Sequence, residues 1–330
     1  MDIKKGIPSL RIAVTEKCNL NCAYCPKHGD SYFLKSKNIL NVNQFSEIIT
    51  IAHRVGIRHF SITGGEPLVV PKLTFLIAKT ISNFTNLGYL RLNTNGILIK
   101  DYFDEIVQSK FSKIKISLDS LKSKNFIDIQ KGVKILKKQN IPIRINMVVG
   151  QNNKDEIYEM INFCEKNELE LKIFDITHYC NTNSDNPDFW KNDYFSLLPL
   201  YDELKEKYGN PEIVFAVGNY GNPMPVFKPN TSSPVRLRIS EQKAYYTKDC
   251  IECKDYMCQD GFCNITLSTD GTLKPCRPEG LDFDTNLFKD DMFKSSLEIK
   301  NIFRHLLSIF KSSEIKNRSL KDVVDSWDKK

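Results

Sequence analysis

Cysteines are the residues of this 330-residue chain whose number and spacing point most clearly to chemistry. Eight of the ten fall into two groups, one near each end, while Cys164 and Cys180 stand alone. No segment near the start predicts export, so we do not expect these thiols to form a disulfide framework. Clustered cysteines in such a chain indicate a metal site or redox chemistry instead.

The first group has the spacing C-x3-C-x2-C and consists of Cys18, Cys22 and Cys25, directly after a predicted strand. Three thiolates can each bind one iron of a [4Fe–4S] cluster, which normally has four cysteine ligands. The fourth iron then keeps an open coordination position, which is typical of catalytic metal centres. The alternative is a zinc site to which His28 supplies a distant fourth ligand.

This motif resembles that of the radical S-adenosylmethionine (radical SAM) enzymes, in which an aromatic residue precedes the last cysteine, as Tyr24 does here. The stretch Gly64-Gly65-Glu66-Pro67, after the second predicted strand, is similar to the GGEP motif of that family. The resemblance implies that the open iron chelates the amine and carboxylate of SAM, and that the GGEP stretch holds its amino group. A carboxylate suits an ammonium group, and the glycines would let the backbone approach a ligand closely.

Further segments resemble the GTP 3′,8-cyclases of molybdenum-cofactor synthesis, over roughly residues 9–177 and again over 263–276. The resemblance assigns contacts with SAM to four polar residues near strand ends, which are Thr94, Asn95, Ser117 and Asn146. Arg11 matches an arginine of the cyclase that faces its substrate. Simpler interpretations exist, because Asn95-Gly96 also fits a turn and Asp119, beside Ser117, fits a helix N-cap.

The second cysteine group is denser than the first. It consists of Cys250, Cys253, Cys258, Cys263 and Cys276. These thiols can hold one auxiliary [4Fe–4S] cluster with Cys250 or Cys258 to spare, or leave an iron open if three of them ligate. Residues 263–276 are predicted to form a hairpin with Asp270-Gly271 at its turn. A hairpin flanked by cysteines resembles the auxiliary-cluster modules called twitch and SPASM domains, and a structural zinc site is the alternative.

Several positions depart from the cyclase pattern. Residues 264–267 are Asn, Ile, Thr and Leu, where the cyclase has arginines that hold the nucleotide, and residues 328–330 do not match its Gly-Gly tail. Arg236, Arg238 and Arg277 are candidates to replace the missing arginines, although a surface position is the simpler interpretation for each. The departures weaken the expectation of a triphosphate bound as in the cyclase. Five cysteines also fall short of the seven of a SPASM module with two clusters.

Alternating strands and helices must position these residues. The predicted strands are 10–15, 58–63, 87–92, 113–118, 143–149 and 169–176, and the predicted helices are 43–55, 73–84, 102–107, 126–138 and 155–166. Six such repeats with short polar joints predict a parallel α/β sheet, and the unusual residues follow strands, where such sheets carry active sites.

We therefore predict an α/β fold with a partial (β/α)6 radical SAM barrel and a smaller C-terminal iron–sulfur domain. The expected division is a barrel at 1–178, a connecting region at 179–248, and an auxiliary-cluster domain with C-terminal helices at 249–330. In the connecting region we expect one helix, near 197–208, and in the tail a helix around 291–311.

Composition fits this prediction. Hydrophobic residues make up 41% and charged residues 26% of the chain, which excludes a disordered chain, a collagen-like fibre and a coiled coil. The net charge of +7, from 47 Lys and Arg against 40 Asp and Glu, suits a small anionic substrate as well as nucleic acid. No membrane span or targeting segment is predicted, so a cytoplasmic protein is expected.

The sequence thus predicts a radical SAM enzyme. Its cofactors would be SAM, a SAM-binding [4Fe–4S] cluster and an auxiliary [4Fe–4S] cluster. Reductive cleavage of SAM would give a 5′-deoxyadenosyl radical that abstracts hydrogen from a small molecule or a ribosomally made peptide. The resemblance also implies an electron donor such as flavodoxin or ferredoxin.

Three alternatives remain for the function. One is nucleotide cyclisation like that of the GTP 3′,8-cyclase. A zinc-dependent nucleic-acid-binding protein and an iron–sulfur electron carrier are the others, but neither accounts for the GGEP stretch together with the six-strand repeat. A nucleic-acid partner is therefore not expected, nor is a membrane.

Overall fold

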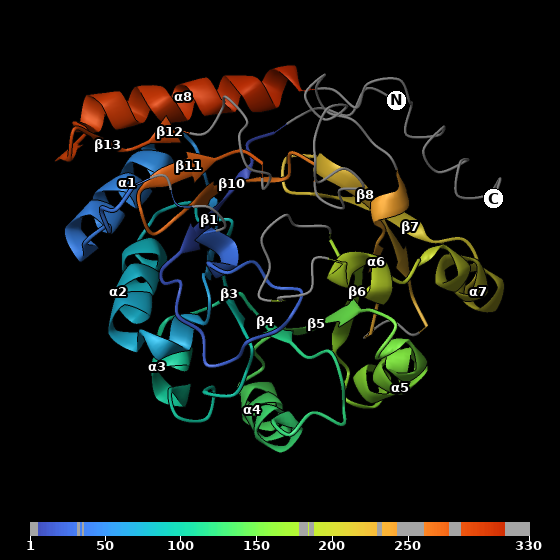
Figure 1. The fold of residues 1–330 in the computed structure, drawn as a ribbon. Coiled ribbons are helices and arrows are strands. Elements are labelled where there is room, and N and C mark those ends of the chain that lie inside the picture. The colour runs from blue at the N-terminus through green and yellow to red at the C-terminus, as the bar shows by residue number, and fades with distance from the viewer. Residues whose placement is uncertain are drawn as a thin grey trace.

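A single curved sheet organises the molecule in the computed structural model. The model describes residues 6–31, 34, 36–177, 184, 188–229, 233–242, 261–276 and 285–313. The sheet has twelve strands in the order β12-β11-β10-β1-β2-β3-β4-β5-β6-β9-β8-β7. Helices surround its outer side (Figure 1), and side chains of its inner side line a cavity.

Six parallel strands form the middle of this sheet. They are β1 (Ser9–Ala13), β2 (His59–Thr63), β3 (Tyr89–Thr94), β4 (Lys113–Ser117), β5 (Ile143–Val149) and β6 (Glu170–Asp175). The helices between them are α1 (Val42–Arg54), α2 (Pro71–Ser82), α3 (Phe103–Gln108), α4 (Phe126–Lys138) and α5 (Ile157–Lys166). Each strand pairs in parallel with the next along the chain, so the predicted partial (β/α)6 architecture is confirmed.

The two faces of these strands differ in chemistry. On β4, Ile114 and Ile116 are fully buried in the core between the sheet and the helices, whereas Lys113 and Lys115 line the cavity on the other face. Burying each such aliphatic side chain stabilises the fold by about 1.5–3 kcal/mol. The hydrophobic core therefore lies outside the barrel wall, and the inner face is free to carry polar groups.

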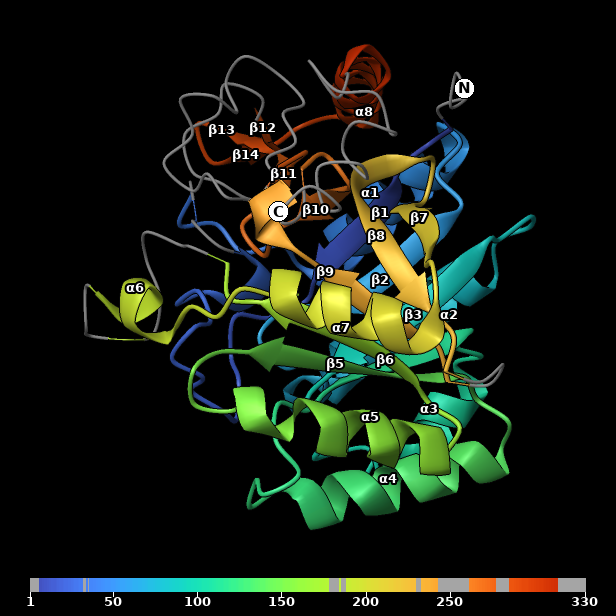
Figure 2. The same cartoon turned by 90° about the vertical axis from the view of Figure 1, so that its right-hand side faces the viewer.

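The region after β6 continues the sheet. It contains α6 (Phe189–Asp193), α7 (Leu198–Tyr208), β7 (Glu212–Ala216), β8 (Tyr220–Phe227) and β9 (Val235–Arg238). Strand β9 pairs in parallel with β6. Strand β8 lies between β9 and β7 and pairs antiparallel with both. Figure 2 shows α4, α5 and α7 along the outer face. The sequence predicted only the helix in this region, because two prolines within β8 are typical of loops rather than strands.

The C-terminal part forms a hairpin on the other edge of the barrel. Its elements are β10 (Asn264–Leu267), β11 (Thr272–Lys274), β12 (Thr285–Asn286), β13 (Phe288–Lys289), β14 (Met292–Phe293) and α8 (Ser296–Ser312). Strand β10 pairs in parallel with β1, and β11 returns antiparallel to β10 after the Asp270-Gly271 turn, as predicted. Gly271 has φ +79°, a conformation that suits glycine.

The last helix begins later than predicted. It starts at Ser296 rather than near Asp291, because Ser295 and Glu298 form a capping box that fixes its first turn. Helix α8 packs along α1 (Figure 1). None of the helices in the described ranges is long and apolar enough to cross a membrane. The division into domains at 178 and 248 stays a prediction.

Candidate active site

The first cysteine group lies on the loop after β1, at the carboxyl ends of the parallel strands. Cys18, Cys22 and Cys25 line one cavity of about 850 Å³ that extends into the barrel. Cys18 is exposed and the other two are partly buried. The Cys25 amide donates to the Cys22 carbonyl at 3.0 Å, so these two cysteines sit on one tight turn.

The GGEP stretch holds the cysteine loop in place through backbone hydrogen bonds. The amides of Gly65 and Glu66 donate to the carbonyls of Thr15 and Lys17 at 2.7 and 2.8 Å. A Cβ on Gly64 would lie 2.4 Å from the Thr15 carbonyl oxygen, and one on Gly65 would lie 2.3 Å from that of Lys17. Only glycine therefore fits at either position. The close approach that these glycines permit is to the cysteine loop itself.

Glu66 is the central acceptor at this rim. Its side chain is fully buried, and its Oε1 accepts from the Leu68 amide at 2.9 Å and from the Thr94 hydroxyl at 2.8 Å. Its Oε2 accepts from the Asn95 amide at 2.6 Å. Burial raises the pKa of Glu66, and the three donors oppose that rise. A carboxylate offers about four acceptor positions, so one remains for a ligand donor.

Three further residues expected to contact SAM lie around the same cavity. Asn95 donates from Nδ2 to Asn19 Oδ1 at 2.7 Å, which ties the end of β3 to the cysteine loop. Ser117 and Asn146 lie opposite one another on β4 and β5 and line the cavity. Asn146 Oδ1 is buried and has no hydrogen-bond donor in the described part of the chain. A buried acceptor of this kind suits a ligand that brings a donor.

Tyr24 is anchored by a residue to which the sequence assigned another role. Its hydroxyl donates to Asp119 Oδ2 at 2.6 Å, and Asp119 Oδ1 accepts from the Val148 amide at 2.8 Å. Burial raises the pKa of both Tyr24 and Asp119. The N-cap interpretation of Asp119 is wrong, because α4 follows Asn125 instead. Asp119 joins the cysteine loop to the ends of β4 and β5.

The zinc alternative for the first cysteine group depends on His28 as the fourth ligand. Zinc needs ligands that converge on one ion, whereas in a cluster each thiolate binds its own iron. His28, the candidate fourth zinc ligand, pairs through Nδ1 with Glu16 Oε2 at 2.7 Å.

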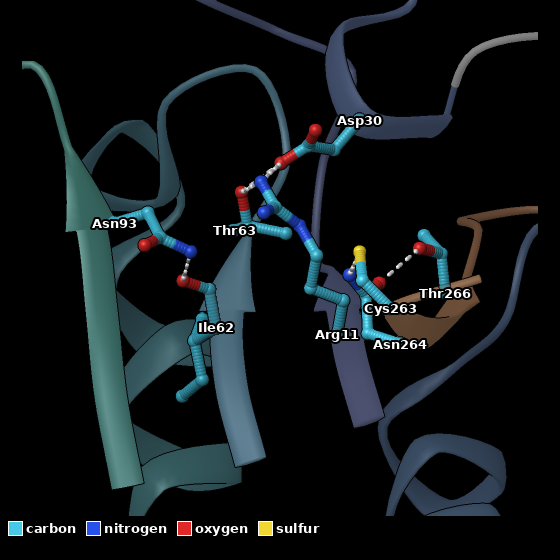
Figure 3. A network of polar contacts seen from close by, with 8 residues as sticks. All are labelled: Arg11, Asp30, Ile62, Thr63, Asn93, Cys263, Asn264 and Thr266. Carbon is cyan, nitrogen blue, oxygen red and sulfur yellow. Dashed lines mark hydrogen bonds and ion pairs between the residues drawn. The ribbon is translucent and has the colours of Figure 1, made fainter. Parts of the chain in front are cut away.

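Arg11 lies on β1 between Thr63 of β2 and Cys263, which precedes β10 (Figure 3). Its guanidinium is hydrogen-bonded to the Asp30 carboxylate and donates to the Thr63 hydroxyl at 3.4 Å. On the neighbouring strand β10, Asn264 donates from Nδ2 to Cys263 Sγ at 2.8 Å. The cavity that begins at Cys18 therefore continues past Arg11 to Cys263.

The second cysteine group is described only in part. Cys263 precedes β10 and Cys276 follows β11, so both lie at the end of the sheet opposite the first group. Cys250, Cys253 and Cys258 lie outside the described residues, and so does Arg277. The auxiliary cluster therefore stays a prediction.

The inner wall of the cavity carries a belt of cations from six strands. They are Arg11, Arg91, Lys113, Lys115, Arg144, Lys172, Arg236 and Arg238. The acidic residues that line the same cavity are Asp30, Asp119 and Asp175. The surface interpretation of Arg236 and Arg238 is wrong, because both line the cavity and Arg238 is only 3% exposed.

Sequence reasoning missed most of this cation belt. The signal was the presence of Arg91, Lys115, Arg144 and Asn146 between pairs of apolar residues in β3, β4 and β5. Parallel strands covered on both faces are normally apolar throughout. Alternation therefore indicates that one face lines a polar cavity.

The chain is similar in sequence to a known family and to named relatives. Residues 12–164 match the model of the radical SAM superfamily. The chain is 30% identical over 212 residues to a probable GTP 3′,8-cyclase of Pyrococcus abyssi. This match covers 61% of this chain and 67% of that protein. It is 32% identical over 182 residues to the GTP 3′,8-cyclase of Clostridium perfringens strain SM101, and this match spans 52% of this chain and 56% of that relative's length.

Solved structures share the fold. Streptococcus suis SuiB bound to S-adenosylmethionine superposes with a TM-score of 0.56 at 15% identity, over 82% of this chain and 60% of that one. The AdoMet-bound structure of anSMEcpe gives a TM-score of 0.55 at 18% identity, over 91% of this chain and 76% of that one.

Proposed function

The chain belongs to the radical SAM superfamily, and on that premise we propose that it generates a 5′-deoxyadenosyl radical which abstracts hydrogen from a small anionic molecule. The observation that carries the proposal is the cation belt, which lines the same cavity as the cysteine loop. Membership of the superfamily supports the radical chemistry, and the cation belt supports a negatively charged substrate.

The residues of the rim would hold the cofactors. Cys18, Cys22 and Cys25 would bind the [4Fe–4S] cluster, which with SAM supplies the radical chemistry. Glu66 has one free acceptor position, and the unpartnered Asn146 Oδ1 offers another to a SAM donor. The protein's own share is to orient these groups and to keep water away from the reacting atoms.

The wall would bind the substrate below the rim. The cavity lining contains nine cations, which are the eight of the belt and Lys124, against three acids. Glu170 neutralises part of the excess through Lys113 and Arg144. A low-dielectric cleft with one sign of charge concentrates counter-ions of the other sign. Arginines add bidentate geometry, which suits carboxylates and phosphates. A compact anion satisfies such a wall better than a peptide backbone does.

GTP cyclisation is the second candidate, and two observations favour it. Relatives carry the name GTP 3′,8-cyclase, and a triphosphate would complement the belt. Against it, Asn264 and Thr266 stand on β10 beside β1, where the resemblance leads one to expect arginines.

A screen of substrates tests the proposal. The reconstituted protein is reduced anaerobically with SAM, and 5′-deoxyadenosine is measured with added phosphorylated compounds, carboxylates, GTP, or neutral peptides. We expect some non-nucleotide anions to accelerate its formation. Acceleration by GTP alone would favour the cyclase, and acceleration by neutral peptides alone would contradict the proposal.

A further inference from the structure

Two lysines on the inner face of β4 differ in their partners. Lys113 Nζ pairs with Glu170 Oε1 at 2.5 Å, and the other oxygen of Glu170 accepts from Arg144 Nε at 2.9 Å. Lys115, the next inward position, has neither a hydrogen bond nor an ion pair with any residue that the structure describes. Its half-buried amine therefore faces the cavity without a counter-charge.

The charges around Lys115 are cations. Arg11 faces it from β1, Arg91 from β3 and Arg144 from β5, and Lys113 precedes it on its own strand. The carboxylate of Glu170, on β6, already pairs with two of these cations, Lys113 and Arg144. Burial first, and then these four cations, lower the pKa of Lys115 well below its usual range. Such surroundings favour the neutral amine, which is the nucleophilic form of a lysine, more than an exposed position does.

We propose that Lys115 is a covalent attachment site for an anionic aldehyde or ketone, held in the cavity as an imine. The inference rests on the proposed function, since it names the class of the small anionic substrate. The amine nitrogen forms a bond to the carbonyl carbon, and the carbonyl oxygen leaves as water after taking up two protons from the nitrogen. No electrons are gained or lost, so no further reactant is needed.

The neighbouring strands supply the complementary charges. Lys115 is in register with Asn93 on β3 and with Arg144 on β5, and Arg91 stands one inward position before Asn93. Arg91 and Arg144 flank the amine and can bind a carboxylate or phosphate of the same molecule. The imine would then hold the substrate in one place beneath the cysteine loop.

Pyridoxal 5′-phosphate is a suitable probe, because it joins an aldehyde to a phosphate. The protein is incubated with it at pH 7, the imine is reduced with borohydride, and the labelled peptide is identified by mass spectrometry. An ordinary lysine with a pKa of about 10.4 is only about 0.04% unprotonated at pH 7. We therefore expect Lys115 to be labelled before all other lysines, and inorganic phosphate to slow its labelling.

Two controls isolate the amine and the charge. Lys115→Arg keeps a basic side chain but cannot form the adduct, so the label should disappear, whereas Lys79→Met, at an exposed lysine of α2 outside the cavity, should keep the Lys115 adduct. Pyridoxal, which lacks the phosphate, should label Lys115 more slowly. A thermal melt and the iron content show that each variant is folded.

Several outcomes would overturn the inference. Labelling spread over many lysines with none at Lys115 would do so, and so would phosphate-dependent binding that leaves no reduced adduct. The proposed function has a separate readout, which is SAM cleavage by the unaltered protein. If the unaltered protein cleaves SAM but Lys115 is not labelled, only the covalent attachment fails. If it does not cleave SAM, the proposed function fails whatever Lys115 does.

Discussion

The rim and the wall of the cavity are built on opposite principles. At the rim, most polar groups satisfy one another, as in the three donors around Glu66 and the bond from Tyr24 to Asp119, while Asn146 Oδ1 and one acceptor position of Glu66 stay open to SAM. On the wall, cations outnumber acids, and Lys115 has no partner in the described part of the chain. A network whose polar groups all have partners holds a fixed geometry, whereas buried polar groups without partners favour the binding of a ligand. The rim therefore suits a cofactor that the whole family shares, and the wall suits the substrate of this protein.

Removing the cysteines of the rim should have the largest effect. Changing Cys18, Cys22 and Cys25 together to Ala should abolish SAM cleavage. If each group holds one [4Fe–4S] cluster, iron should fall from about eight to about four per chain. Iron analysis and 5′-deoxyadenosine assays measure both. The buried Cys164 is the matched control, because Cys164→Ala should retain both iron and cleavage. Cleavage by the triple variant would remove the first group from the site.

The second prediction concerns the central acceptor of the rim. Glu66→Gln removes the charge and replaces one acceptor oxygen by a donor, so SAM loses a charge-assisted partner worth roughly 1.5–3 kcal/mol. We expect SAM affinity to fall about ten- to hundredfold with the iron content unchanged. Isothermal titration under anaerobic conditions measures the affinity. Glu203→Gln, at an exposed glutamate of α7, should leave affinity unaltered, and an equal loss in both variants would refute the assignment of Glu66.

The third prediction tests the wall through Glu170 on β6, which pairs with Lys113 and Arg144 of the cation belt. Burial alone would raise the pKa of Glu170. Arg144 and Lys113 outweigh burial and lower this pKa to about 2. A lowered pKa means that the ion pairs stabilise the fold at neutral pH, and that this stabilisation is lost as pH falls from about 4.5 through about 2. Glu170→Gln should therefore lower the free energy of unfolding by about 2–3 kcal/mol at pH 7, and by progressively less as pH falls through this range.

Denaturant unfolding at several pH values measures this difference. Glu168→Gln is the matched control, because Glu168 is exposed and pairs with Lys137 at the surface, where such pairs contribute about 0–1 kcal/mol. The Glu170 variant should also bind inorganic phosphate more tightly, since the wall gains net positive charge. A pH-independent loss of stability would show that Glu170 acts through packing rather than charge.

The sequence predicted the rim far better than the wall, for a physical reason. Cys18 to Cys25 and Gly64 to Pro67 are short stretches whose order along the chain resembles known family motifs. The belt has no such local signature. Arg91, Lys115 and Arg236 are far apart in the chain and meet only because β3, β4 and β9 turn the same face inward.

The sequence analysis also missed a strand because of its amino-acid composition. The six central strands follow from their apolar runs, but β8 was missed because Pro223 and Pro225 lie within it. The role of Asp119 was missed because its partner Tyr24 is 95 residues away in the chain. A pairwise contact of this kind cannot be read from either residue alone.

One measurement tests the division of labour between rim and wall most directly. The rate of 5′-deoxyadenosine formation is followed at saturating SAM while the best anion from the screen is titrated in, beside its dephosphorylated or decarboxylated counterpart. The account predicts saturable acceleration by the anion, little by its neutral counterpart, and competition from inorganic phosphate that lowers apparent affinity for the anion without lowering the maximal rate. Equal acceleration by the charged and neutral compounds, unaffected by phosphate, would contradict it.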